Sequence, residues 1–215
     1  ALAIKPDYLE AHYNLGNALQ ELGKLEEAVA SYRKALAIQP NYAEAHYNLG
    51  NALQELGKLE EAIASYRKAL DLKPDFPEAH SNLGLALQDL GKSEDAIASY
   101  RKALALNPDY PEAHYNLGVS LQDLGKLEEA VASYQKALDL KSDYAEAHNN
   151  LGSVLQELGK PEEAIASYRK ALAIKPDLAE AHNNLGIALR ELGHLDEAVT
   201  SYRKALGLKP DYADA

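Results

Sequence analysis

Histidine is one of the residue types that recur at a fixed spacing in this sequence and could do chemistry. Six of the seven histidines recur every 34 residues, at His12, His46, His80, His114, His148 and His182. Histidine is a common zinc ligand. Neighbouring helices pack ~8–10 Å apart and a His–zinc bond is ~2 Å long, so equivalent histidines cannot share one ion without turning toward each other. We interpret the row as packing residues and expect no metal site.

Asparagine recurs with the same period and offers different chemistry. The row consists of Asn14, Asn48, Asn82, Asn116, Asn150 and Asn184. A carboxamide carries one acceptor and two donors, so it can pair with a peptide unit of an extended chain. The row therefore predicts a ladder that binds the backbone of an extended peptide whatever its sequence. Two structural alternatives stay open, namely recent duplication and hydrogen bonds between adjacent repeats.

Variable positions beside the asparagines could read the side chains of such a peptide. One of them holds Tyr, Tyr, Ser, Tyr, Asn and Asn in successive periods, and the other holds Asn, Asn, Leu, Val, Ser and Ile. The predicted peptide-binding residues beside the asparagine row are Tyr13, Asn17, Tyr47, Asn51, Leu85, Tyr115 and Val119.

Catalysis has little support in the sequence. Cysteine is absent, which excludes thiol chemistry and zinc–thiolate sites. Neither a Gly-rich phosphate loop nor a GxSxG motif occurs. The serines at Ser31 and its equivalents repeat with the scaffold, so they look architectural. We expect no enzyme activity and no cofactor.

Composition limits the class of protein and of partner. The chain has 215 residues, of which 47% are hydrophobic, and this content favours a packed helical protein. Its formal net charge of −11 disfavours nucleic acid as a partner. No run of about 18 apolar residues appears, so we expect no membrane span. The lack of cysteine points weakly to a cytoplasmic location.

Two helices are predicted in each period. Asn41 with Glu44, and the acidic pairs at equivalent positions, resemble a capping box at the start of the first helix. That helix is expected to end near Leu22, before a left-handed Gly23, and the second helix to begin near Leu25. Pro40 ends the period.

The first helix divides into two faces at 3.6 residues per turn. The expected core face consists of Ala11, His12, Leu15, Gly16, Ala18, Leu19 and Leu22. The expected polar face consists of Glu10, Tyr13, Asn14, Asn17, Gln20 and Glu21. Glycine inside a helix costs ~1 kcal/mol relative to alanine, so the recurring Gly16 position predicts a close approach of the two helices, with Ala28 and Ala35 as the facing small residues.

The sequence resembles the tetratricopeptide repeat through Leu15, Gly16, Ala28, Tyr32, Ala35 and Pro40 and their equivalents. The resemblance implies an all-α, right-handed superhelical solenoid of six helix-turn-helix repeats. The predicted repeats are 9–42, 43–76, 77–110, 111–144, 145–178 and 179–212. Residues 1–8 are then expected to end a preceding second helix, and residues 213–215 to start a further repeat. In this family the first helices line the inner wall of the superhelix, which would place the asparagine row in a concave groove.

Resemblance to particular members of the family bears on the partner. Some chaperone-binding members hold a C-terminal carboxylate with cations, but the corresponding positions here are Tyr13, Asn17, Asn48, Glu78 and Asn82. An extended peptide that is neutral or basic is therefore the expected partner. The repeats also resemble the arm of O-linked N-acetylglucosamine transferases, so the chain could present substrate to a larger glycosyltransferase. The third hypothesis is a structural or consensus-designed array that stacks end to end.

Overall fold

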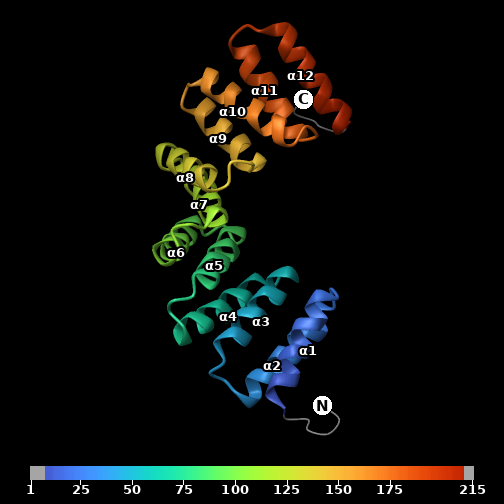
Figure 1. The fold of residues 1–215 in the computed structure, drawn as a ribbon, viewed down its shortest axis with the longest axis vertical. Helices are drawn as coiled ribbons and strands as arrows, with labels where there is room; N and C mark the ends of the chain where they lie inside the picture. Colours follow the sequence, from blue (N-terminus) through green and yellow to red (C-terminus); the bar gives the residue numbers. More distant parts are fainter. Residues whose placement is uncertain (1–7, 211–215) are drawn as a thin grey trace. The chain divides into compact units, whose positions relative to one another are not determined.

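A computed structural model describes residues 8–210 of the chain, and this part contains helices and turns but no strand. Twelve helices follow one another in antiparallel pairs (Figure 1). The helices are α1 (Leu9–Glu21), α2 (Leu25–Ile38), α3 (Ala43–Glu55), α4 (Leu59–Leu72), α5 (Pro77–Asp89), α6 (Ser93–Leu106), α7 (Pro111–Asp123), α8 (Leu127–Leu140), α9 (Ala145–Glu157), α10 (Pro161–Ile174), α11 (Ala179–Glu191) and α12 (Leu195–Leu208). The prediction of an all-α chain of six helix-turn-helix repeats is confirmed.

The turn between the two helices of a pair is built around a glycine, as predicted. Gly23 has a φ of 71°, a left-handed conformation that glycine adopts without a steric penalty. The amide of Gly23 donates to the carbonyl of Gln20 at 2.9 Å, and that of Lys24 donates to the carbonyl of Leu19 at 2.8 Å. These two bonds form a Schellman motif, which satisfies carbonyls at the end of the first helix. The same pair of bonds recurs at Gly57 and Lys58.

The predicted capping box is wrong. The residue that caps α3 is Tyr42, not Asn41, and its side chain makes no capping hydrogen bond. Glu44 is consequently one position too early in the helix for a capping box. Its carboxylate instead accepts from its own backbone amide and pairs with Lys73 at 3.1 Å, and both interactions lower the pKa of Glu44. Glu146 pairs with Lys175 in the same way at 3.1 Å.

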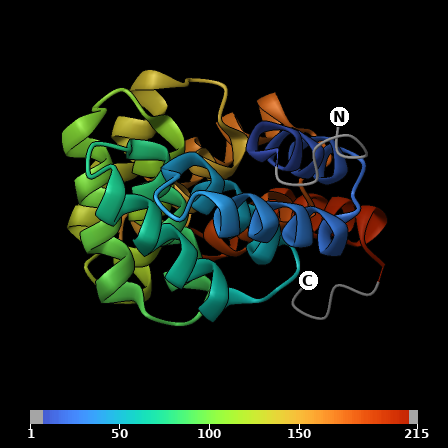
Figure 2. The ribbon, with the colours of Figure 1, turned by 90° about the horizontal axis from the view of Figure 1, so that it is seen from below.

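The chain divides into two compact units, residues 1–108 and 109–215. In the first unit each helix from α1 to α6 packs against the next, and the first helices α1, α3 and α5 also contact one another in sequence order. The second unit repeats this pattern from α7 to α12. Figure 2 shows the same helices, with the same colours along the sequence, from a second direction. The sequence-based assignments for residues 1–7 and 213–215 lie outside the described residues.

The core of each pair contains a tyrosine that presses against a glycine. Tyr66 of α4 is fully buried, and a Cβ atom placed on Gly50 of α3 would lie 2.6 Å from its ring. The predicted close approach at the recurring glycine is therefore confirmed. The three nearest atoms belong to the tyrosine ring, which the sequence did not indicate, and the expected small residues, Ala62 and Ala69 in this repeat, are fully buried.

Candidate functional site

The asparagine row lies on the first helices, at the same position in every helix. Asn14 is exposed, and the other five asparagines are partly exposed. The predicted neighbours are also partly exposed, including the apolar Leu85 and Val119. On the opposite face the core prediction is confirmed in α3, where Ala45, Leu49 and Leu53 are buried, but it is wrong for Leu22, which is 72% exposed. In each unit the first helices thus present a partly polar strip, and the predicted binding residues lie on these strips.

Hydrogen bonds to the preceding repeat occupy the donor atoms of Asn48 and Asn82. The Nδ2 atom of Asn48 donates to the Tyr13 hydroxyl at 3.0 Å and to Asn17 Oδ1 at 3.0 Å. Asn82 Nδ2 repeats both bonds, at 3.1 Å to Tyr47 and 2.9 Å to Asn51. A carboxamide has only two N–H donors, so both are used. The structural alternative of hydrogen bonds between repeats therefore accounts for the donor half of these two amides.

The carbonyl half of these two amides remains open. Within the described part of the chain, no group donates a hydrogen bond to Oδ1 of Asn48 or of Asn82. Each oxygen belongs to a side chain whose orientation is fixed by two hydrogen bonds. In Asn48 and Asn82 the donor half of the amide is therefore used inside the protein and the acceptor half is not, whereas Asn150 Oδ1 accepts from Asn149 Nδ2 at 3.3 Å.

The buried tyrosines connect the row to the core. The Tyr66 hydroxyl donates to Asn51 Oδ1 at 2.9 Å and also approaches Gln54 Oε1 at 2.9 Å. Because Asn51 Oδ1 also accepts from Asn82, a continuous polar network links one pair to the next. Burial raises the pKa of the Tyr66 hydroxyl above its usual value, so this hydroxyl remains protonated and can donate.

Aromatic rings close the junction between repeats. The rings of Tyr13 and Tyr42 lie 4.9 Å apart, and those of Tyr47 and Phe76 lie 4.7 Å apart. Lys73 places its Nζ 4.6 Å from the centre of the Phe76 ring, within the range of a cation–π contact.

Asparagine takes the place of the half-buried tyrosine in the last two pairs. Asn149 is 2% exposed; its Nδ2 donates to Glu180 Oε1 at 3.3 Å, and its Oδ1 accepts from Asn184 Nδ2 at 3.3 Å. Tyr115, in the first pair of the second unit, keeps the original arrangement and accepts from Asn150 at 3.1 Å. Residue changes at this variable position therefore alter the hydrogen bonds between repeats. The sequence analysis had assigned this position to ligand contact alone.

The histidines lie on the buried side of the first helices, as expected for packing residues. His80 Nε2 contacts the Pro74 carbonyl at 3.0 Å. Because a carbonyl can only accept, Nε2 carries the proton and Nδ1 is the buried acceptor. Burial lowers the pKa of His80. Within residues 8–210 no group of three or more potential ligands is placed to hold a metal ion.

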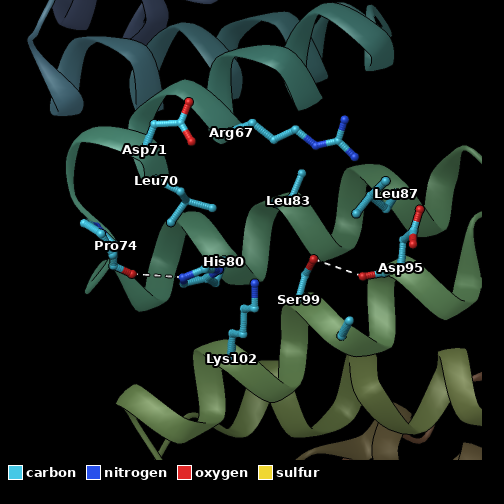
Figure 3. Close-up of a pocket in the computed structure, with 11 residues that line it drawn as sticks. Arg67, Leu70, Asp71, Pro74, His80, Leu83, Leu87, Asp95, Ser99 and Lys102 are labelled. Atoms are coloured by element: carbon cyan, nitrogen blue, oxygen red, sulfur yellow. Dashed lines mark hydrogen bonds between the residues drawn. The ribbon is translucent and has the colours of Figure 1, made fainter.

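Sequence reasoning missed a set of cavities on another face, between consecutive second helices. One of about 680 Å³ lies between α4, α5 and α6, with His80, Leu83 and Leu87 of α5 as its floor (Figure 3). Arg67 and Lys102 approach it from the two flanking helices. Similar cavities of about 570 Å³ recur over His148 and over His182. Recurring positions mark these cavities in the sequence, since a histidine, a leucine and a lysine at equivalent positions line all three.

No helix in the described part of the chain is both long enough and apolar enough to cross a membrane.

Comparisons with known proteins give a consistent result. Models of the TPR repeat match residues 19–57, 50–91 and 89–125, and models of the tetratricopeptide repeat match residues 1–30, 109–177 and 143–211. A search of curated proteins finds no match.

Solved structures share the fold. The crystal structure of MamA is 32% identical, covers 78% of this chain and 98% of its own, and gives a TM-score of 0.72. YrrB, described as a TPR protein with an unusual peptide-binding site, is 27% identical over 84% of this chain and 93% of its own, with a TM-score of 0.73. PilF of Pseudomonas aeruginosa is 22% identical, covers 96% of this chain and 94% of its own, and gives a TM-score of 0.83. At this identity the similarity shows the fold alone. Because the matched segments span nearly the whole sequence, the chain belongs to the tetratricopeptide repeat family.

Proposed function

We propose that this chain is a protein-interaction scaffold that binds an extended, neutral or basic peptide along the strip of first helices. The observation that carries the proposal is the pair of open carbonyl oxygens on Asn48 and Asn82, each held by two hydrogen bonds from its own amide. The related YrrB structure is described as having a peptide-binding site, which supports a peptide as the class of ligand.

The spacing of the first helices favours a particular peptide conformation. Helices in contact lie ~8–10 Å apart, and α1, α3 and α5 contact one another in order. A polyproline II helix has 3 residues per turn and rises ~3.1 Å per residue, so its turns repeat every ~9 Å. A peptide in this conformation presents the same face to each successive asparagine. Its backbone N–H groups, or Lys and Arg side chains, would supply the donors that the open oxygens accept.

Charge supports a basic ligand over an acidic one. The formal net charge of the chain is −11. Exposed acidic residues follow the asparagines at the ends of the first helices, at Glu55 and Asp89. An acidic peptide would bring like charges together on this strip, which costs free energy.

The experiment measures peptide binding by fluorescence anisotropy. The probes are two fluorescein-labelled peptides of about nine residues, one with repeated Pro-Pro-Lys triplets and one with repeated Pro-Pro-Glu triplets. We expect the Lys peptide to bind and the Glu peptide to bind at least about tenfold more weakly. Equal binding of both peptides, or binding of neither, would contradict the proposal.

A matched pair of variants separates ligand contact from folding. Asn82→Ala removes the open oxygen and the bonds to the preceding repeat, whereas Tyr47→Phe removes one of those bonds and keeps the oxygen. We expect Asn82→Ala to weaken binding of the Lys peptide and Tyr47→Phe to preserve it, while circular dichroism shows both variants folded. If the two variants bind alike, the asparagine row has a structural role only.

The second hypothesis, that this chain is the substrate-presenting arm of a larger glycosyltransferase, stays a prediction. The sequence of a longer parent chain would test it.

A further inference from the structure

The cavity over His182 has the size and the apolar walls of a small-molecule site. It lies between α10, α11 and α12, has a volume of about 570 Å³ and is called the α10–α12 cavity below. Leu172, Leu185 and Leu208, one from each helix, line it. A cavity of the same volume lies over His148, between α8, α9 and α10, so the shape comes from the packing of three helices in the repeat. Small-molecule sites have volumes of about 300–1,000 Å³.

A lysine at the same position lines each of the three cavities. The three lysines are Lys102 of α6, Lys170 of α10 and Lys204 of α12. Lys204 is exposed, and no carboxylate within residues 8–210 forms an ion pair with it. An ammonium group that has no such partner can bind an anionic ligand without first losing a carboxylate.

The carboxylates that line the three cavities differ. Asp71 and Asp95 line the cavity over the α5 histidine, and Figure 3 shows Asp71 of α4 and Lys102 of α6 on opposite sides of it. Asp139, which is equivalent to Asp71, lines the cavity between α8, α9 and α10. Ala173 takes this position in the α10–α12 cavity, and within the described part of the chain no aspartate or glutamate lines that cavity.

A second cation lines the α10–α12 cavity. Arg169 of α10 donates from Nη2 to Glu197 Oε2 at 2.8 Å, and both side chains are 56% exposed, so solvent screens this pair. Glu197 lines a smaller neighbouring cavity. A guanidinium has five N–H donors, so Arg169 keeps donors for a ligand. Gln135 takes the place of this arginine between α8 and α10. The α10–α12 cavity is therefore the one of the three that combines two cations with no carboxylate.

We propose that the α10–α12 cavity binds a small organic acid, with the carboxylate at Lys204 and the apolar body over the three leucines. Charge complementarity carries the choice of ligand. The whole chain has a formal net charge of −11, so an anion is attracted here by local cations and not by the overall charge. The aspartates of the other two cavities repel the same carboxylate. The site lies between second helices and is separate from the asparagine row, so it does not depend on peptide binding.

The experiment is isothermal titration calorimetry of the 215-residue chain with three probes. Octanoate carries both the carboxylate and the apolar body, octylamine carries the same body with a positive charge, and acetate carries the carboxylate alone. We expect one octanoate to bind with a Kd of about 1 mM or tighter, and the other two probes to bind at least about tenfold more weakly. The net charge of the chain favours the ammonium ion, so preference for octanoate identifies a local cationic site. Absence of octanoate binding, or equal or tighter binding of octylamine or acetate, would overturn the proposal.

Ala173→Asp gives the α10–α12 cavity the aspartate that the other two cavities contain. Ala173 is exposed, and Asp71 and Asp139 occupy its position in α4 and α8, so the variant should keep the fold, which circular dichroism checks. We expect octanoate to bind about tenfold more weakly to this variant, because two carboxylates then share one cavity. Unchanged affinity for octanoate in the folded variant would overturn the proposal.

A pair of lysine variants locates the site. Lys204→Gln removes the cation of the α10–α12 cavity and should also weaken octanoate binding about tenfold. Lys34→Gln removes the same charge at the equivalent, exposed position of α2, which lines none of the three cavities. We expect Lys34→Gln to bind octanoate like the unmodified chain. If the two lysine variants bind octanoate with equal affinity, the α10–α12 cavity is not the site.

Discussion

Gly50→Ala tests the contact that fixes the geometry of each helix pair. A Cβ atom at residue 50 would lie 2.6 Å and 2.7 Å from two carbons of the Tyr66 ring, inside the ~3.5–4.0 Å at which carbon atoms attract. The ring is 0% exposed and its hydroxyl lies 2.9 Å from each of two amide oxygens, to one of which it donates, so the ring has little room to move. Overpacking of a core costs ~1–3 kcal/mol.

A gain in helix propensity opposes this cost. Alanine is favoured over glycine in a helix by ~1 kcal/mol. The net effect of Gly50→Ala is therefore an expected loss of up to ~2 kcal/mol in the free energy of unfolding. For a chain of this size each kcal/mol lowers the melting temperature by about 2–4 °C.

Gly207→Ala supplies the matched control. Gly207 lies near the end of α12, and a Cβ atom there would meet no other atom within 4 Å. This variant gains helix propensity without a clash, so we expect it to be up to ~1 kcal/mol more stable than the unmodified chain. Urea unfolding followed by circular dichroism measures both variants. If Gly50→Ala is as stable as Gly207→Ala, the tyrosine–glycine contact does not limit the approach of the helices.

Three further predictions concern the tyrosine hydroxyls, the histidines and the turn glycines. Tyr66→Phe should lower the free energy of unfolding, measured with urea, by ~1 kcal/mol or more, because it removes a hydroxyl that contacts two acceptors. Tyr202→Phe should lower it by less, because the Tyr202 hydroxyl is buried without a hydrogen bond among the described residues. Burial lowers the pKa of His80 in the folded state, so the unfolded chain binds more protons below pH ~6.5, and the free energy of unfolding should fall as the pH drops through this range. The His80→Gln variant should lose less free energy of unfolding than the unmodified chain between pH ~7 and ~5. Equal losses in the two chains would contradict the prediction. Gly57→Ala should lower the free energy of unfolding by about 1 kcal/mol in the same assay, because φ at Gly57 is +72° and alanine is strained in this left-handed conformation. An unchanged midpoint of urea unfolding would contradict this prediction.

Local features of the fold could be predicted from the sequence because they depend on residues close together in the chain. The helix pairs follow from the period, the end of the first helix from Gly23, and the starts of α5 and α10 from Pro77 and Pro161, which occupy the first helical position. The start of the other first helices was misplaced by one residue, since Tyr42 and not Asn41 precedes α3. The periodic pattern of apolar residues shows which side of a helix is buried, but it does not fix the exact residue at which the helix begins.

The candidate site was predicted in part for a related reason. The sequence placed the asparagine row on the polar face of the first helices, and it left open whether the amides contact a ligand or a neighbouring repeat. The structure shows that the donors of Asn48 and Asn82 contact the preceding repeat and leave the oxygens open. The N–H donors of Asn48 are used because their acceptors, 31 and 35 residues earlier in the chain, lie within hydrogen-bonding distance. Packing between helices sets the positions of these acceptors.

The sequence by itself therefore determined the repeat, its two helices, their buried faces and the family. Tertiary structure alone decided that Gly50 faces the Tyr66 ring, that cavities lie between consecutive second helices, and that Asn183 has a buried oxygen without a donor. The physical reason is that secondary structure and amphipathic faces follow from residues within a few positions of one another. Contacts between helices depend instead on how each helix is rotated and inclined against the next, and a repeating pattern of residue types does not specify those angles.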